Sequence, residues 1–220
     1  MSVRRLQYRS AMNAGFSLLE LMWAVLIAGV LAAVAVPSFV EWRESQQLRD
    51  SALAVSSAFS YARSEAVRTG NIHLVLFQRD AQGTLLSGSP ILVVDDGRPA
   101  SSDQNCSIDS AEPSKQFFLG DNVTFGLTNA SGTVSTDAGA STITNGSTFE
   151  DAAGNAATWV LFRPEGPPRA FSSDCTAGSI GSGGGGIYLT NGDRNTAVVL
   201  TPLGASRTHR WLASSASWSS

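Results

Sequence analysis

The sequence predicts an α+β protein in which one long N-terminal helix packs on an antiparallel β-sheet domain. Residues 16–70 begin with an apolar run of membrane length and continue with apolar side chains every three or four residues, the pattern of an amphipathic helix. After Gly70 the apolar side chains fall in short runs between Gly, Ser and Asp turns, which indicates strands. Because no second long amphipathic helix follows, we expect these strands to form an antiparallel sheet against the helix.

Length and charge limit the classes of function. The 220 residues allow a membrane segment and one domain, and a hydrophobic content of 43% excludes general disorder. The net charge is −3; without Arg4, Arg5 and Arg9 the chain keeps 12 basic and 18 acidic side chains, a net charge of −6. Such a chain repels nucleic acid, so DNA binding requires a local basic patch.

Residues 16–36 have the length and composition of a membrane anchor, with Glu20 as the one charged side chain. The three arginines of residues 1–15 favour a cytoplasmic N-terminus and therefore a single-pass topology with the domain outside. A cleaved secretory signal has a shorter apolar run followed by a small-x-small site, whereas here helix-compatible sequence continues. We therefore expect the anchor to be retained, with a kink at Pro37.

Glu20 is a candidate functional residue because an ionisable group within an apolar span is costly. It ends the hexamer GFSLLE, Gly15 to Glu20, which resembles the class III signal of type IV prepilins. The resemblance implies that residues 1–15 are a leader, that a membrane peptidase cuts between Gly15 and Phe16, and that Phe16 is N-methylated. It also implies that Glu20 pairs with the amino terminus of a neighbouring subunit during assembly. The alternative is a plain anchor with an incidental glutamate.

The helix is predicted to continue past the membrane. We expect residues 16–40 to form the transmembrane or filament-core part and residues 41–70 an amphipathic part, ending at Gly70-Asn71. The whole helix, residues 16–69, would measure roughly 80 Å. Its predicted buried face consists of Leu48, Ala52, Val55, Phe59, Ala62 and Ala66.

Residues 71–220 are predicted to hold about seven strands. These are Ile72–Arg79, Ile91–Val94, Phe117–Leu119, Val123–Leu127, Thr158–Arg163, Ile187–Thr190 and Thr196–Thr201. Residues 128–157 are rich in Thr, Ser, Asn and Gly and predict a long hairpin or mobile loop. Residues 172–186 contain SIGSGGGG and are not expected to form regular structure.

The chain has two cysteines, Cys106 and Cys175, whose spacing fits neither a redox CxxC motif nor a zinc site. In a domain outside the cytoplasm one disulfide is the simplest arrangement, and two free thiols are the alternative.

Beyond the anchor the chain resembles the GspH/FimT group of minor pseudopilins and minor pilins. Residues 57–71 match the group's L-x-x-A-R-S-E-A pattern through Phe59, Ala62, Arg63, Ser64, Glu65, Ala66 and Arg68. Val160–Pro164 with Glu165-Gly166 resembles its F-x-P-x-G segment. The stretch from Val198 to Gly204, followed by Arg207 and Arg210, resembles its closing strand and G-R-x-R, although Ala205 and Ser206 interrupt the motif.

The resemblance implies a subunit of a type II secretion pseudopilus or a type IV pilus, placed near the filament tip. Its partners would be other pilins or pseudopilins, the prepilin peptidase and the bacterial inner membrane, with residues 71–220 in the periplasm. Resemblance to FimT also implies a second function, DNA binding through Arg194, Arg207, His209 and Arg210. The alternative for these four residues is ordinary solvation of a loop.

The sequence contains no catalytic motif that we can identify, so we expect neither an enzyme nor a metal or other cofactor. His73 lies in an apolar run and is predicted to be a core or edge residue. Asp95-Asp96 could be a metal or acid/base pair, but the following Gly97 favours a turn. The GSGGGG run lacks a following Lys-Ser or Lys-Thr and is predicted to be a loop rather than a phosphate cradle.

Overall fold

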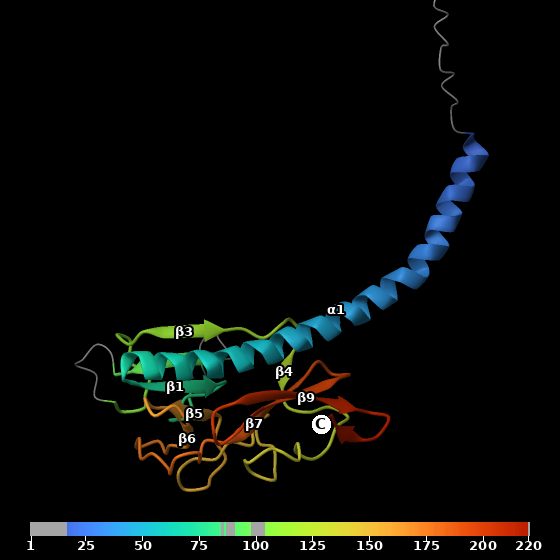
Figure 1. The fold of residues 1–220 in the computed structure, drawn as a ribbon. Helices are drawn as coiled ribbons and strands as arrows, with labels where there is room; N and C mark the ends of the chain where they lie inside the picture. The colour runs from blue at the N-terminus through green and yellow to red at the C-terminus, as the bar shows by residue number, and fades with distance from the viewer. Residues whose placement is uncertain (1–16, 85, 87–90, 98–103, 220) are drawn as a thin grey trace, which may run out of the picture. The chain divides into compact units, whose positions relative to one another are not determined.

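The computed structural model describes residues 17–84, 86, 91–97 and 104–219. It contains helix α1 (Leu18–Thr69) and ten strands, and it divides into two compact units, Met1–Trp42 and Arg43–Ser220. The predicted cleavage site at Gly15 and Phe16, with the rest of residues 1–15, lies outside the described residues. Figure 1 shows the helix and the strands.

Helix α1 begins and ends at recognisable caps. The Ser17 hydroxyl accepts a hydrogen bond from the Glu20 amide at 3.2 Å, as an N-cap residue does. At the other end Gly70 has a φ of +75°, and its amide donates to the Ala66 carbonyl at 3.0 Å, which terminates the helix. The predicted helix is thus confirmed over the described residues, and it continues through Pro37.

The strands form two five-stranded antiparallel sheets rather than one. The first has the order β3-β2-β1-β5-β6: β3 (Ser114–Phe117), β2 (Ile91–Asp96), β1 (Ile72–Phe77), β5 (Trp159–Phe162) and β6 (Pro168–Arg169). The second has the order β10-β9-β8-β7-β4: β10 (Ser217–Trp218), β9 (Ser206–Leu212), β8 (Asn195–Leu200), β7 (Gly185–Thr190) and β4 (Thr124–Phe125). Within the Arg43–Ser220 unit, the helix and both sheets share one core.

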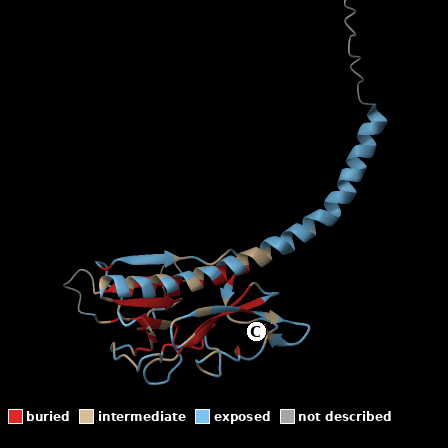
Figure 2. Cartoon of the chain, viewed as in Figure 1, coloured by how far each residue is buried: buried red, intermediate tan, exposed pale blue. Residues whose placement is uncertain are grey.

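The predicted helical face is the centre of that core. All six of its side chains are buried, and they pack on alternate residues of both sheets, including Val75, Val160 and Val198. Figure 2 shows this face of the helix as buried, whereas its residues before Arg43 are exposed on all sides. Four strands, β1, β2, β7 and β8, are buried along their whole length, because their other faces are covered too. Continuous burial explains why the sequence shows apolar runs there instead of alternation.

Several strand predictions need correction. Predicted Phe117–Leu119 is displaced to Ser114–Phe117, because β3 is an exposed edge strand whose position follows from pairing with β2. Predicted Val123–Leu127 shortens to the two residues of β4. Strands β6, β9 and β10 were not predicted. The sequence of β9, SRTHRWL, has too few apolar residues to show the alternation from which a strand is predicted.

Two segments predicted to be irregular are part of the packed domain. Residues 128–157 are not a long hairpin; Val134 and Phe149 are buried, and the Tyr188 hydroxyl donates to Asp137 at 2.7 Å. In the glycine run, Gly185 begins β7, and a side chain there would lie 2.6 Å from the Phe149 ring. The glycine therefore serves to admit a core phenylalanine, which composition alone does not indicate.

Candidate functional site

Glu20 lies in the first turn of α1, in the exposed N-terminal segment. Because Ser17 caps the helix and Glu20 follows three residues later, the two form the S-x-x-E pattern of a capping box. A negative charge is also favoured at this end of a helix. The structure shows one half of such a box, the bond from the Glu20 amide to the Ser17 hydroxyl, and the S-x-x-E spacing suits Glu20 to the other half, a helix-starting role that the sequence interpretation did not consider.

The helix around Glu20 is long and apolar enough to span a membrane. Its large apolar side chains are exposed, among them Leu18 at 77% and Val34 at 69%. None of the described residues of the first compact unit covers them, so this segment needs an apolar environment from outside those residues.

The three segments that carry the GspH/FimT resemblance meet at Arg63. Its guanidinium donates to the Gly204 carbonyl at 3.3 Å, and a side chain at Gly166 would lie 3.6 Å from its Nε. Arg63 thus connects the helix with the turn after β5 and the turn after β8. Arg63 is exposed, and its one side-chain hydrogen bond among the described residues is to this backbone carbonyl.

Cys106 and Cys175 form a disulfide, with Cα atoms 5.2 Å apart, which confirms the predicted pairing. The bond covers the side of the first sheet that faces away from the helix, where Leu74, Leu76 and Phe171 are buried. Asp96 lies beneath it, and its carboxylate accepts a hydrogen bond from the Cys106 amide at 2.9 Å.

The predicted turn follows strand β2 at Gly97, whose amide donates to the Asp95 carbonyl at 3.1 Å, and the carboxylates of Asp95 and Asp96 do not form a pair. Both end strand β2 and are buried, and because strand residues alternate, they point to opposite faces of the sheet. Asp95 is opposite His73, whereas Asp96 faces the disulfide. In the described part of the chain, the only group spaced for a metal is Asp96 with Cys106 and Cys175. Those sulfurs are bonded to each other and offer no thiolate.

Glu112 brings a second carboxyl group to Asp96. It is 8% exposed, and its Oε2 accepts the Asp109 amide at 3.0 Å. Burial raises the pKa of Glu112 against the opposing hydrogen bond from the Asp109 amide, and with the contribution of the Asp96 charge the pKa is about 7. At neutral pH the two carboxyl groups therefore hold a proton for part of the time.

Replacing Glu112 by glutamine should remove a pH dependence of stability. A carboxyl pKa raised from 4.5 to about 7 favours folding below pH 4.5, and this contribution is lost as the pH rises to 7. The loss is at most about 3 kcal/mol. Glutamine imitates the protonated acid, so the Glu112→Gln variant should match the wild type at pH 4.5 and exceed it at pH 8. Urea unfolding of the full chain in detergent at both pH values would measure this, and an equal difference at both would contradict it.

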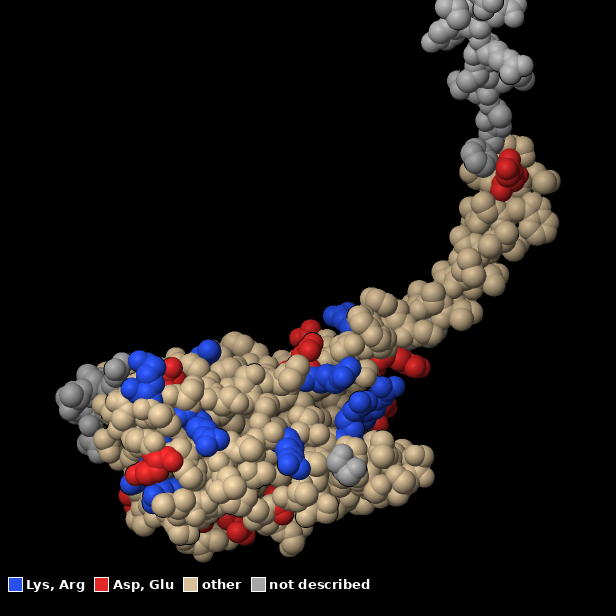
Figure 3. All heavy atoms as spheres, viewed as in Figure 1, with Lys and Arg blue, Asp and Glu red and all other residues tan. Residues whose placement is uncertain are grey.

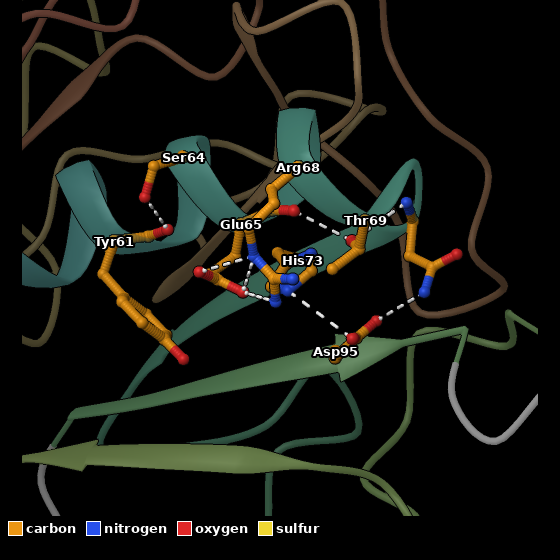
Figure 4. A network of polar contacts seen from close by, with 8 residues as sticks. Tyr61, Ser64, Glu65, Arg68, Thr69, His73 and Asp95 are labelled. Carbon is orange, nitrogen blue, oxygen red and sulfur yellow. Dashed lines mark hydrogen bonds and ion pairs between the residues drawn. The ribbon is translucent and has the colours of Figure 1, made fainter.

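His73 and Asp95 are the buried members of a polar cluster at the end of the helix, in which Arg68 is exposed (Figure 4). His73 is 3% exposed, which confirms the predicted core position, and its Nε2 lies 3.8 Å from Asp95. Burial lowers the pKa of His73 although Asp95 opposes the change, so the ring is neutral at neutral pH. Asn71 donates to Asp95 at 3.1 Å, and Glu65 pairs with Arg68 on the helix. The contacts of Asp95 with Asn71 and His73 fasten the end of the helix to β1 and β2.

The four residues predicted to bind DNA do not form one patch. On β9 the side chains alternate, so Arg207 and His209 face one side and Arg210 the other. His209 is 5% exposed and its Nδ1 lies 2.6 Å from the Ser219 carbonyl, so it is a packed residue. Arg210 instead lies with Arg194 and with Arg49 of the helix, along one hollow. The sequence interpretation missed Arg49, because only the fold brings it to β9.

Basic and acidic side chains are interspersed over the visible face of the domain (Figure 3). No family model, curated protein or solved structure matches this chain in the comparisons with known proteins.

Proposed function

We propose that this protein is a minor subunit of a bacterial type IV filament, of the GspH/FimT type. In this proposal residues 16–40 anchor it in the inner membrane, and residues 71–220 lie in the periplasm. Its N-terminal helix then assembles with other pilins or pseudopilins into a type II secretion pseudopilus or a type IV pilus, near the tip. The protein acts by assembly and not by catalysis.

One observation carries the proposal. The GFSLLE signal overlaps the start of an exposed helix of membrane length, and the same helix supplies the core face of a two-sheet antiparallel domain. A plain anchor needs neither the signal nor a helix that continues as the centre of the domain. The meeting of three separate motifs at Arg63 adds support, because these are the segments in which the chain resembles GspH/FimT proteins.

The test is the mass of the mature protein. We expect protein extracted from membranes to lack residues 1–15 and to carry one methyl group on Phe16. Expression in a matched strain without prepilin peptidase should yield the uncleaved chain. A Gly15→Asp variant should remain uncleaved in both strains. Recovery of a mature chain that begins at Met1 in the competent strain would reject the proposal.

A second candidate function, DNA binding, is favoured by the gathering of Arg194 and Arg210. If Arg49, Arg194 and Arg210 hold duplex DNA, log affinity should fall with log salt with a slope of about −2 to −3. The Arg194→Gln/Arg210→Gln variant should lose most of that binding. A gel-shift series at low salt in which this variant binds as well as the wild type would reject this function.

A further inference from the structure

An arginine groove lies between the helix and the second sheet. It is lined by Arg49 of α1, Arg194 of the turn between β7 and β8, and Arg210 of β9. The groove consists of two adjoining hollows of about 300 and 610 Å³, which share Arg49, Thr196, Arg210 and Leu212. All of these residues belong to the Arg43–Ser220 unit.

The three guanidinium groups have no partners within the described part of the chain. All three residues are exposed, and no ion pair or side-chain hydrogen bond from them is found among the described residues. By contrast, Arg63 bonds to Gly204 and Arg68 pairs with Glu65. Three unpaired arginines at one groove favour a ligand with anionic oxygens, and phosphate and carboxylate are the groups whose geometry matches the guanidinium fork.

Two further properties of the residues that line the groove restrict the chemical class of the ligand. Asp50 and Asp193 also line the hollows, so the groove has a net charge of +1, which suits one phosphate better than a polyanion. Leu53 and Leu212 in the lining are 61% and 45% exposed. A ligand with a phosphate and an apolar portion would satisfy both the arginines and the leucines.

The position of the groove along the chain, shortly after the apolar helix segment, indicates that such a ligand would come from the membrane surface. Phe39 and Trp42 are 62% and 57% exposed and lie at the end of the apolar helix, as aromatic residues do at a membrane surface. Arg49 follows Trp42 by seven residues in the sequence, and seven residues span at most about 25 Å even when fully extended. Chain connectivity alone therefore keeps Arg49 near the bilayer surface at which the apolar segment ends, and a lipid headgroup is a ligand available there.

We propose that the arginine groove binds the phosphate of an anionic phospholipid in the membrane that holds the anchor helix. Leu53 and Leu212 contact the glycerol and upper acyl part of the same lipid. The site holds the domain at the bilayer surface before assembly and releases it when the subunit leaves the membrane. This inference rests on the membrane anchorage in the proposed function.

The experiment uses the full chain in nanodiscs that contain a lipid with a photoreactive headgroup. One set contains a phosphatidylglycerol probe, which is anionic, and the other a phosphatidylcholine probe, which is zwitterionic. We expect the anionic probe to cross-link residues 45–53 and 206–213 preferentially. Arg49→Gln and Arg210→Gln should each lower this preference about fivefold, and both together about thirtyfold. Arg79→Gln, which removes an exposed arginine outside the groove, is the matched control and should leave the preference unchanged.

Equal cross-linking by both probes, or an unchanged preference in the double variant, would overturn the inference. So would displacement of the lipid cross-links by duplex DNA at low salt, which would assign the groove to nucleic acid. Equal melting temperatures of variants and wild type exclude misfolding as the cause of a loss. A chain that does not enter the nanodisc would reject the membrane anchorage itself, and with it the proposed function. A chain that enters it without lipid preference rejects this inference alone.

Discussion

Replacing Glu20 by alanine is expected to leave the protein in the membrane while its entry into filaments falls at least tenfold. Loss of one partner from a charge pair in an apolar environment costs roughly 3–5 kcal/mol, because the other charge remains unpaired. Insertion itself should not suffer, since the change makes the span more apolar. The measurement is the ratio of subunit in sheared filaments to subunit in the membrane fraction.

The capping box at Ser17 makes glutamine the decisive control. Glutamine serves as well as glutamate at the third position of a capping box, but it carries no charge. If Glu20 acts through its charge, Glu20→Gln should fail to assemble as Glu20→Ala does. If Glu20→Gln assembles normally while Glu20→Ala does not, the residue acts by starting the helix, and the charge-pair role assigned to Glu20 is wrong.

Removing the disulfide is expected to lower the free energy of unfolding of the domain by about 4 kcal/mol. The bond links residues 69 positions apart, and closing so long a loop removes much of the entropy of the unfolded chain. The Cys106→Ser/Cys175→Ser variant should therefore unfold at a clearly lower urea concentration than the oxidised wild type.

Reduction of the disulfide in the wild type is the control for effects of the two introduced serine side chains. Wild-type protein in dithiothreitol should unfold near the midpoint of the double variant, because both lack only the cross-link. Asp96 should still hold the Cys106 amide in both forms, so the native fold should persist without urea. Equal midpoints for oxidised and reduced wild type would contradict the expected contribution of the bond.

The sequence predicted the elements whose signal is local. The helix is long and strongly periodic, and strands such as β1 and β8 are nearly continuous apolar runs, so their positions follow from composition. Strand β9 could not be found in this way, because it is largely exposed and its pairing with Ala197 and Val199 of β8 makes it a strand. Two sheets instead of one also follow from pairing, which composition does not encode.

The candidate sites also fall into two groups, those that the sequence alone identifies and those that only the fold brings together. Glu20 and the two cysteines could be identified from the sequence because their residue types are unusual where they occur. The arginine groove could not, since Arg49 and Arg210 are ordinary surface residues until the fold places them side by side. Glu112 likewise becomes unusual only because its turn places it against buried Asp96.

The burial of one helix face against both sheets has a mechanical consequence. Leu48, Val55 and Phe59 are spaced along the helix and packed on the shared core, and Arg63 extends the attachment to two turns. A pull along the helix axis loads these contacts in parallel, so they must yield together in shear. Peeling the strands apart one at a time would need far less force. A helix attached in this way can pass tension to the two sheets of the Arg43–Ser220 unit without the contacts failing one after another.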